Sequence, residues 1–223
     1  MLLSQGLFFN RLTKIDAVKI TGDLLDPLKA ECQAEVLENF TTLKNKKLLE
    51  IGSGLGINLA VWIKKYCIDG YGVEPSGNGF DNSFGISRDL FSVNNINTDR
   101  ITSAYGEELP FPENCFDIVY SSNVLEHTSV PEKVIREGMR VLKPGGTLQF
   151  VFPNYHSFFD GHYAVFHPPV VTHLFFPFYV KYITKRDNTF AKTLITQLNV
   201  WWTLNALKKL KVEYPHVILS MGE

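Results

Sequence analysis

LLEIGSGLG, residues 48–56, runs from an apolar stretch directly into three glycines at alternate positions. Glycines at this spacing allow a tight turn with positive φ and let a ligand lie against bare backbone. The segment that follows, INLAVWIKKY (57–66), reads as a helix, whose unpaired N–H groups and positive dipole end would face that ligand. The stretch therefore predicts a strand, a ligand-binding turn and a helix in succession.

The position of Glu50 narrows the class of ligand. In the dinucleotide fingerprint GxGxxG the third glycine comes three positions after the second, and the turn holds a pyrophosphate. Here the spacing is GxGxG, and Glu50 stands two residues before the first glycine. A carboxylate there would repel a pyrophosphate but suits an ammonium group. S-adenosylmethionine carries an ammonium group and no phosphate, so the pattern favours this ligand.

A second acidic residue, Glu74, closes the strand-like run IDGYGVEP (68–75). An acidic residue at a strand end about 20 residues after a glycine turn can accept hydrogen bonds from both ribose hydroxyls. Glu74 suits a dinucleotide and S-adenosylmethionine equally. It therefore indicates a nucleoside without choosing between the two ligands.

Strand-like and helix-like segments alternate along the chain up to residue 153. Such alternation predicts an α/β fold, a Rossmann-like, doubly wound and mostly parallel sheet with helices on both faces. The expected strands are 46–52, 68–75, 100–106, 116–124 and a fifth within 142–153 that follows a turn at Pro144–Gly146. The expected helices are 28–40, 57–66, 87–95 and 130–142.

After Pro153 the pattern changes to an aromatic-rich insertion without a clean period. We expect one domain over 1–223: an N-terminal helical segment (1–45), a cofactor-binding core (46–153), an aromatic lid or substrate segment (154–188) and a C-terminal part (189–223). That last part reads as a long helix over about 189–210 and a strand within 211–220.

Four motifs together resemble one known family. LLEIGSGLG resembles the first motif of the class I S-adenosylmethionine-dependent methyltransferases, and GVEPS (72–76) resembles the second. LPFPENCFDIV (109–119), VLEH (124–127) and LKPGGTL (142–148) resemble the small-molecule branch that contains the ubiquinone-biosynthesis enzymes. The resemblance implies O- or N-methylation of a small-molecule, lipid-type or glycan-type acceptor, with S-adenosylhomocysteine as the product.

The same resemblance implies which residues hold the cofactor. The methionine part would meet Glu50, Gly52, Ser53, Gly54 and Gly56. The ribose and adenosine would meet Glu74, Pro75 and Ser76, and the adenine edge Gly106, Glu107 and Glu108. Ser121, Ser122 and Asn123 would lie under the sulfonium, at the carboxyl end of the fourth strand.

Methyl transfer from a sulfonium mainly requires in-line placement of the nucleophile and exclusion of water. A general base is needed only when the acceptor must lose a proton, and histidine suits that task near pH 7. His127 follows the fourth strand and is the candidate base; a histidine merely hydrogen-bonded in its loop is the alternative.

The aromatic segment supplies the candidate acceptor-binding residues His156, His162, Tyr163 and His167. Its histidines lack a regular ligand spacing, so we expect no metal site. Aromatic rings with a few polar groups suit the pocket wall over an amphipathic or ring-containing acceptor. Packing at the sheet edge, or a contact between two copies in a homodimer, is the alternative use of this segment.

The composition indicates which partners the protein can attract and in which cellular compartment we expect it. The chain has 223 residues and a formal net charge of -1, so no long-range field draws it to nucleic acid or to an anionic membrane. Three widely separated cysteines indicate free thiols, and the first residues lack the features of a signal peptide, so we expect a cytoplasmic protein. No apolar run has the length of a membrane span, and the strongest candidate for membrane contact is HLFFPFYVKYI (173–183).

Two rival functions remain open from the sequence. A nicotinamide-dependent oxidoreductase would use a similar turn, but the GxGxG spacing and the lack of a Tyr-x-x-x-Lys pair count against it. A methyltransferase-like protein that binds a cofactor or a partner without catalysis would carry the same glycines.

Overall fold

The computed structural model describes residues 25–76, 81–154, 159–160, 165–166, 175–185 and 198–214. Contacts divide these residues into two units. The first holds the residues up to Val124 together with Lys133–Val151, and the second holds Leu125–Glu132 and the residues from Phe152 onward. The organisation as one domain over 1–223 stays a prediction.

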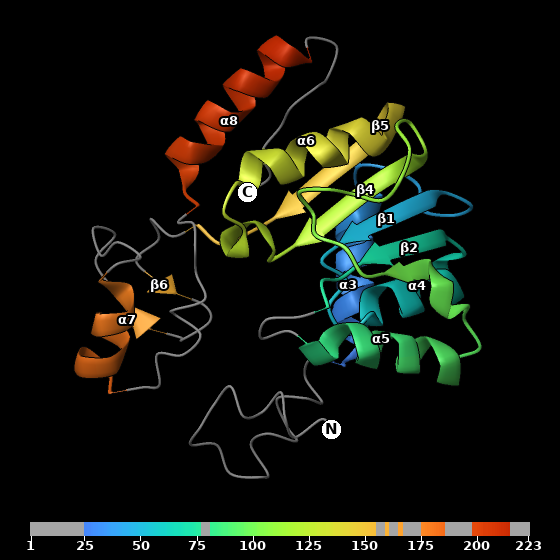
Figure 1. Cartoon of the computed structure of the whole chain (residues 1–223), viewed down its shortest axis with the longest axis horizontal. Coiled ribbons are helices and arrows are strands. Elements are labelled where there is room, and N and C mark those ends of the chain that lie inside the picture. The colour runs from blue at the N-terminus through green and yellow to red at the C-terminus, as the bar shows by residue number, and fades with distance from the viewer. Residues whose placement is uncertain are drawn as a thin grey trace. The chain divides into compact units, whose positions relative to one another are not determined.

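The first unit is built on a five-stranded sheet (Figure 1). Its strands are β1 (Lys47–Ile51), β2 (Asp69–Val73), β3 (Ile101–Thr102), β4 (Phe116–Ser122) and β5 (Leu142–Val151), in the order β3-β2-β1-β4-β5. Every adjacent pair is parallel, as the strand–helix alternation predicts. The order reverses between β1 and β4, and open parallel sheets bind their ligands at the carboxyl ends of the strands beside such a reversal.

Helices cover both faces of this sheet, which confirms the predicted doubly wound fold (Figure 1). α6 (Pro131–Val141) packs over β4 and β5, where Gly138 lets it approach Val119 and Leu148 closely. α3 (Pro27–Glu38), α4 (Ile57–Tyr66) and α5 (Asp81–Val93) lie on the other face. α5 begins six residues before the helix expected at 87–95, and a short 3-10 turn, η1 (Thr98–Arg100), precedes β3.

Two strands differ from the sequence prediction. β3 has only two residues, although 100–106 was expected to be extended. Instead of a turn followed by a strand, Leu142–Val151 forms one strand with a bulge: Leu142 pairs with Phe116, and Thr147 already pairs with Ile118. Gly145 supplies a φ of 78° within the bulge, so a helix-ending glycine pair serves here to bend a paired strand.

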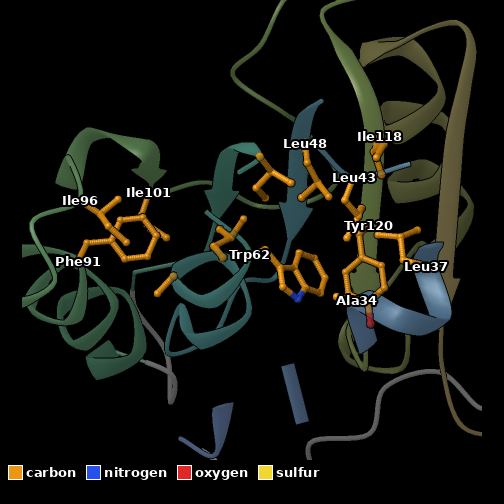
Figure 2. Close-up of a cluster of buried hydrophobic side chains, with 13 residues drawn as sticks. Ala34, Leu37, Leu43, Leu48, Trp62, Phe91, Ile96, Ile101, Ile118 and Tyr120 are labelled. Carbon is orange, nitrogen blue, oxygen red and sulfur yellow. The ribbon is translucent and has the colours of Figure 1, made fainter. Parts of the chain in front are cut away.

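The core under α4 joins side chains from the strands to those of three helices (Figure 2). Trp62 of α4 is fully buried and packs edge-to-face on Tyr120 of β4, with ring centroids 5.1 Å apart. The indole N–H of Trp62 donates to the Ala30 carbonyl at 2.7 Å and thereby ties α4 to α3. The contact between these two large rings thus packs α4 against β4.

The second unit contains several short elements and one longer helix. They are η2 (Leu125–His127), an antiparallel pair of β6 (Phe159–Asp160) and β7 (Val165–Phe166), α7 (Phe176–Phe178), a π-helical turn η3 (Tyr179–Ile183) and α8 (Val200–Glu213). None of the helices in the described ranges is long and apolar enough to cross a bilayer.

The C-terminal helix begins later than the sequence predicts. Leu198 and Asn199 are not helical, and the Asn199 side chain caps α8 by accepting from the Trp202 N–H at 2.9 Å. The expected continuous helix over about 189–210 is therefore wrong at 198–199, and residues 189–197 lie outside the described ranges. The expected strand within 211–220 is also wrong at its start, because Lys211–Glu213 form the last turn of α8; its remaining residues lie outside the described ranges.

Candidate active site

The glycine turn joins β1 to α4 and is anchored on the end of β2. The N–H groups of Gly52 and Ser53 both donate to the Val73 carbonyl, at 2.9 and 3.0 Å. Gly52, Gly54 and Gly56 have φ angles of 71°, 52° and 77°, in the left-handed region that favours glycine. The turn therefore has the conformation expected from the sequence.

The three glycines are needed for different reasons. A Cβ on Gly52 would lie 2.2 Å from Val124 Cγ2, and one on Gly56 would lie 3.0 Å from Ser87 Cβ. Packing inside the first unit therefore requires both of these glycines. A Cβ on Gly54 would meet no described atom within 4 Å. Gly54 is thus the glycine at which a ligand can approach bare backbone.

Glu50 is buried at the carboxyl end of β1, with 2% of its surface exposed. Its Oε1 accepts from Asn58 Nδ2 at 2.7 Å, whereas Oε2 has no hydrogen-bond partner among the described residues. Burial raises the pKa of Glu50 to about 8; the Asn58 hydrogen bond opposes this and the charge of Glu74 adds to it. A buried carboxylate oxygen without a donor fits a cationic ligand group and does not fit a phosphate.

Glu74 comes immediately after β2 and contacts the glycine turn at Gly54. It is 6% exposed, and its Oε2 accepts from the Gly54 N–H at 2.9 Å. Burial raises the pKa of Glu74, and the hydrogen bond from Gly54 opposes the rise. A carboxylate has room for more hydrogen bonds than this one, so Glu74 retains acceptor capacity for ligand hydroxyls.

Ser76 pairs with a residue that the sequence did not single out. The Ser76 N–H donates to Ser103 Oγ at 3.2 Å, and the two hydroxyls are hydrogen-bonded to each other. Pro75, just before, is half-buried. Ser103 follows β3, the neighbour of β2, so only the strand order brings these two serines together.

The end of β4 combines a fixed residue with an exposed one. The Ser121 hydroxyl is buried and donates to the Ile51 carbonyl at 3.0 Å, which ties β4 to the end of β1. Asn123 is exposed, with a φ of 56° and its N–H on the Val151 carbonyl at 2.9 Å. Asparagine tolerates this left-handed conformation better than most residues, so the chain turns away from the sheet here.

Tyr120 lies beside Glu50 as its register partner in the neighbouring strand. Burial, together with the charge of Glu50, raises the pKa of Tyr120 to about 12, against a hydrogen bond with Ser122. The phenol therefore stays protonated.

The expected adenine-edge residues form a turn after β3. The Glu108 N–H donates to the Tyr105 carbonyl at 3.2 Å, and Glu107 is half-buried. A Cβ on Gly106 would lie 2.9 Å from Ile51 Cγ2 and 3.0 Å from Val134 Cγ1. Gly106 is therefore required for close packing between α6 and the end of β1.

The remaining predicted residues fall in two places. His127 ends η2 in the second unit and is half-buried. The other predicted residues lie outside the described ranges: His156, His162, Tyr163 and His167. All of these roles stay predictions.

Sequence reasoning missed Asn58, which donates to Glu50 Oε1, and Tyr120, the register partner of Glu50. The available signal for Asn58 was its place as the second residue of α4, one turn from the glycines. Tyr120 gave no signal, because an aromatic residue in an apolar strand reads as ordinary core.

Comparison with known proteins supports a single family. Residues 49–150 match the family model described as "Methyltransferase domain". Over 109 residues the chain is 38% identical to "Uncharacterized methyltransferase C1B3.06c" of Schizosaccharomyces pombe, covering 46% of this chain and 38% of that protein. Over 124 residues it is 30% identical to phosphoethanolamine N-methyltransferase of Plasmodium falciparum, covering 53% of this chain and 43% of that one.

The matched part thus spans about two fifths of the length of these relatives. Among solved structures, the YcgJ protein of Bacillus subtilis is similar with a TM-score of 0.58 at 17% identity, over 79% of this chain and 65% of that chain. This likeness shows a shared fold.

Proposed function

Residues 49–150 belong to the class I S-adenosylmethionine-dependent methyltransferase family, and from this premise we propose that the protein methylates a small-molecule acceptor at oxygen or nitrogen. S-adenosylmethionine is the cofactor of this family. When bound, it supplies an electrophilic methyl group on a sulfonium. Lipid-type and glycan-type acceptors belong to the same proposal.

One observation carries the proposal: two buried carboxyl groups lie at the glycine turn, close enough for the charge of Glu74 to raise the pKa of Glu50. Glu50 offers an oxygen that lacks a donor among the described residues, and Glu74 is held by the Gly54 N–H at 2.9 Å. The first suits the ammonium group of an amino acid, and the second suits the hydroxyls of a ribose. No phosphate is required by this arrangement, and Glu50, once ionised beside a cationic ligand group, would disfavour one.

The residues of the turn would bind and orient the cofactor. Asn58 holds Glu50 Oε1 so that the other oxygen remains for the ammonium group. The N-terminus of α4, which begins after Gly56, favours the cofactor's carboxylate through its unpaired N–H groups. Pro75, Ser76 and the turn at Gly106–Glu108 would line the adenosine, and the residues 121–123 would face the methyl group.

The chemistry asked of the protein at the methyl group is positioning, exclusion of water and, for some acceptors, removal of one proton. Orientation of the nucleophile contributes roughly 7–11 kcal/mol in favourable cases. For an acceptor hydroxyl or ammonium, His127 would take the proton. The histidines and Tyr163 of the aromatic segment would contact the acceptor.

The chemical class of the acceptor must be determined by experiment. One relative is named as a phosphoethanolamine N-methyltransferase, which makes amines an informative class to include. We would screen transfer of a tritiated methyl group to amines, phenols, sugars and lipid-linked hydroxyls. Calorimetry with S-adenosylmethionine, S-adenosylhomocysteine and NADH would be run in parallel.

The expected result is binding of both sulfur nucleosides, no binding of NADH, and transfer to at least one acceptor class. Tight binding of NADH with none of S-adenosylmethionine would refute the assignment of the turn. Cofactor binding with no transfer to any class would favour a non-catalytic binding protein.

A further inference from the structure

The helix formed by α7 and η3 (176–183) has an unusual exposed face. Phe175, Phe178, Tyr182 and Ile183 are each 57–65% exposed. A helix that faces water normally presents polar side chains there, and a contiguous apolar patch marks an interaction site. We propose that this aromatic face is a peripheral membrane contact, which seats its rings in the interface of an anionic lipid bilayer.

The opposite face of this helix packs against the rest of the second unit. Phe176 and Val180, one turn apart, are buried. The Tyr179 hydroxyl donates to the Phe166 carbonyl of β7 at 2.5 Å. Because the helix is fixed on this side, the exposed rings cannot turn inward without breaking these contacts.

Two of the exposed rings, Phe178 and Tyr182, contact each other. The ring centroids of Phe178 and Tyr182 are 4.5 Å apart, at an interplanar angle of 38°. Aromatic rings with one polar end, such as tyrosine, favour the boundary between lipid headgroups and acyl chains. The length of the helix suits a segment lying in this boundary, not one crossing the bilayer.

Lysines accompany the rings. Lys181 and Lys185 are exposed on the same segment, and Lys181 Nζ lies 5.3 Å from the centre of the Tyr182 ring. The rings would enter the interface, whereas the ammonium groups of Lys181, within the helix, and Lys185, just after it, would remain at the headgroups.

The sequence around this helix concentrates positive charge. The described segment 175–185 carries two Lys and no Asp or Glu, a net charge of +2. Since the whole chain has a net charge of -1, the other residues carry -3. The overall balance therefore conceals a basic segment at this helix.

This charge favours an anionic bilayer over a second copy of the chain. Two copies meeting at this face would bring like charges together, whereas phosphatidylserine or phosphatidylglycerol headgroups would attract the lysines. Each lysine close to such a surface strengthens binding by about fivefold, and the gain falls as salt is added.

The test is co-sedimentation of the full chain with phosphatidylcholine vesicles, with and without phosphatidylserine. We expect binding to the phosphatidylserine vesicles that weakens with salt. Phe178→Ser with Tyr182→Ser should reduce the affinity about tenfold or more, and Lys181→Glu with Lys185→Glu should remove the preference for phosphatidylserine. Val93→Ser and Lys44→Glu, which change exposed residues of the first unit, are the matched controls and should bind as wild type does.

Each variant is compared with wild type by thermal unfolding, so that lost binding is separated from lost folding. The lysine variant changes only exposed charges and keeps the proposal testable if the aromatic variant does not fold. Absence of vesicle binding by the wild type would refute the proposal. So would binding of both helix variants to phosphatidylserine vesicles as tightly as the wild type binds. It would equally be refuted if size-exclusion chromatography showed a dimer that the aromatic variant converts to monomers without any vesicle binding.

Discussion

Replacing Glu50 with Gln should stabilise the protein without its cofactor and weaken its binding of S-adenosylmethionine. Glutamine keeps the shape of the side chain and an oxygen for the Asn58 amide, which now lies 2.7 Å from Glu50 Oε1. It removes the carboxyl group whose buried position raises its pKa to about 8. The change therefore separates the cost of burying an ionisable group from its use in binding.

The size of the effect follows from the pKa of Glu50, which rises from 4.5 to about 8 on folding. Between these two values the unfolded chain has lost the proton and the folded chain retains it. The free energy of unfolding therefore falls as the pH rises from 4.5 towards 8. The contribution of Glu50 is complete below pH 4.5, and about 3 kcal/mol of it is lost by pH 7, at 1.36 kcal/mol for each pKa unit.

Glutamine does not titrate, so the variant escapes this loss. At pH 7 its melting temperature should exceed that of the wild type by about 6–12 °C, and near pH 4.5 the two should nearly coincide. Its affinity for S-adenosylmethionine should fall by about 10- to 100-fold, the usual weight of a hydrogen bond to a charged group.

The assay is thermal unfolding from about pH 5 to pH 9, with and without S-adenosylmethionine. Calorimetry in buffers of different ionisation enthalpy adds a second measure: at pH 7 the wild type should release close to one proton per cofactor bound, because a carboxyl group of pKa about 8 is mostly protonated there. Glu35→Gln changes an exposed carboxylate of α3 to which no role in cofactor binding is assigned, and it is the matched control.

The reasoning would be refuted in either of two ways. A variant that melts below the wild type at pH 8 would show that Glu50 is not held protonated by burial. A variant that binds S-adenosylmethionine as tightly as the wild type would show that the ammonium group lies elsewhere.

Three further substitutions test the turn and the candidate base. Gly54→Val should abolish cofactor binding measured by calorimetry, because its side chain would occupy the space beside Gly54 where no described atom lies; undiminished binding would contradict the assignment. Gly52→Ala should lower the free energy of unfolding measured with denaturant by about 2–4 kcal/mol, because its Cβ would lie 2.2 Å from Val124 Cγ2, and Val124→Ala should restore part of the loss. His127→Ala should slow methyl transfer with little change in cofactor affinity, and an unaltered rate would remove His127 from the mechanism.

The sequence by itself determined the central features of the fold. The strand, turn and helix over 47–66 follow from local signals, an apolar run and glycines in the left-handed conformation, and the structure confirms them. The alternation of strands and helices likewise predicts the parallel sheet that is observed. The positions of Glu50 and Glu74 at strand ends needed only the same local pattern.

Tertiary structure decided what local signals leave undetermined. Gly52 and Gly54 look alike in the sequence, yet Val124, 72 residues from Gly52, makes one a packing requirement and leaves the other open to a ligand. The pKa of Glu50 depends on its burial, on the Asn58 amide of α4 and on the charge of Glu74 after β2. Desolvation and close contact depend on atoms brought together from distant parts of the chain, so neither could be obtained from the order of residues alone.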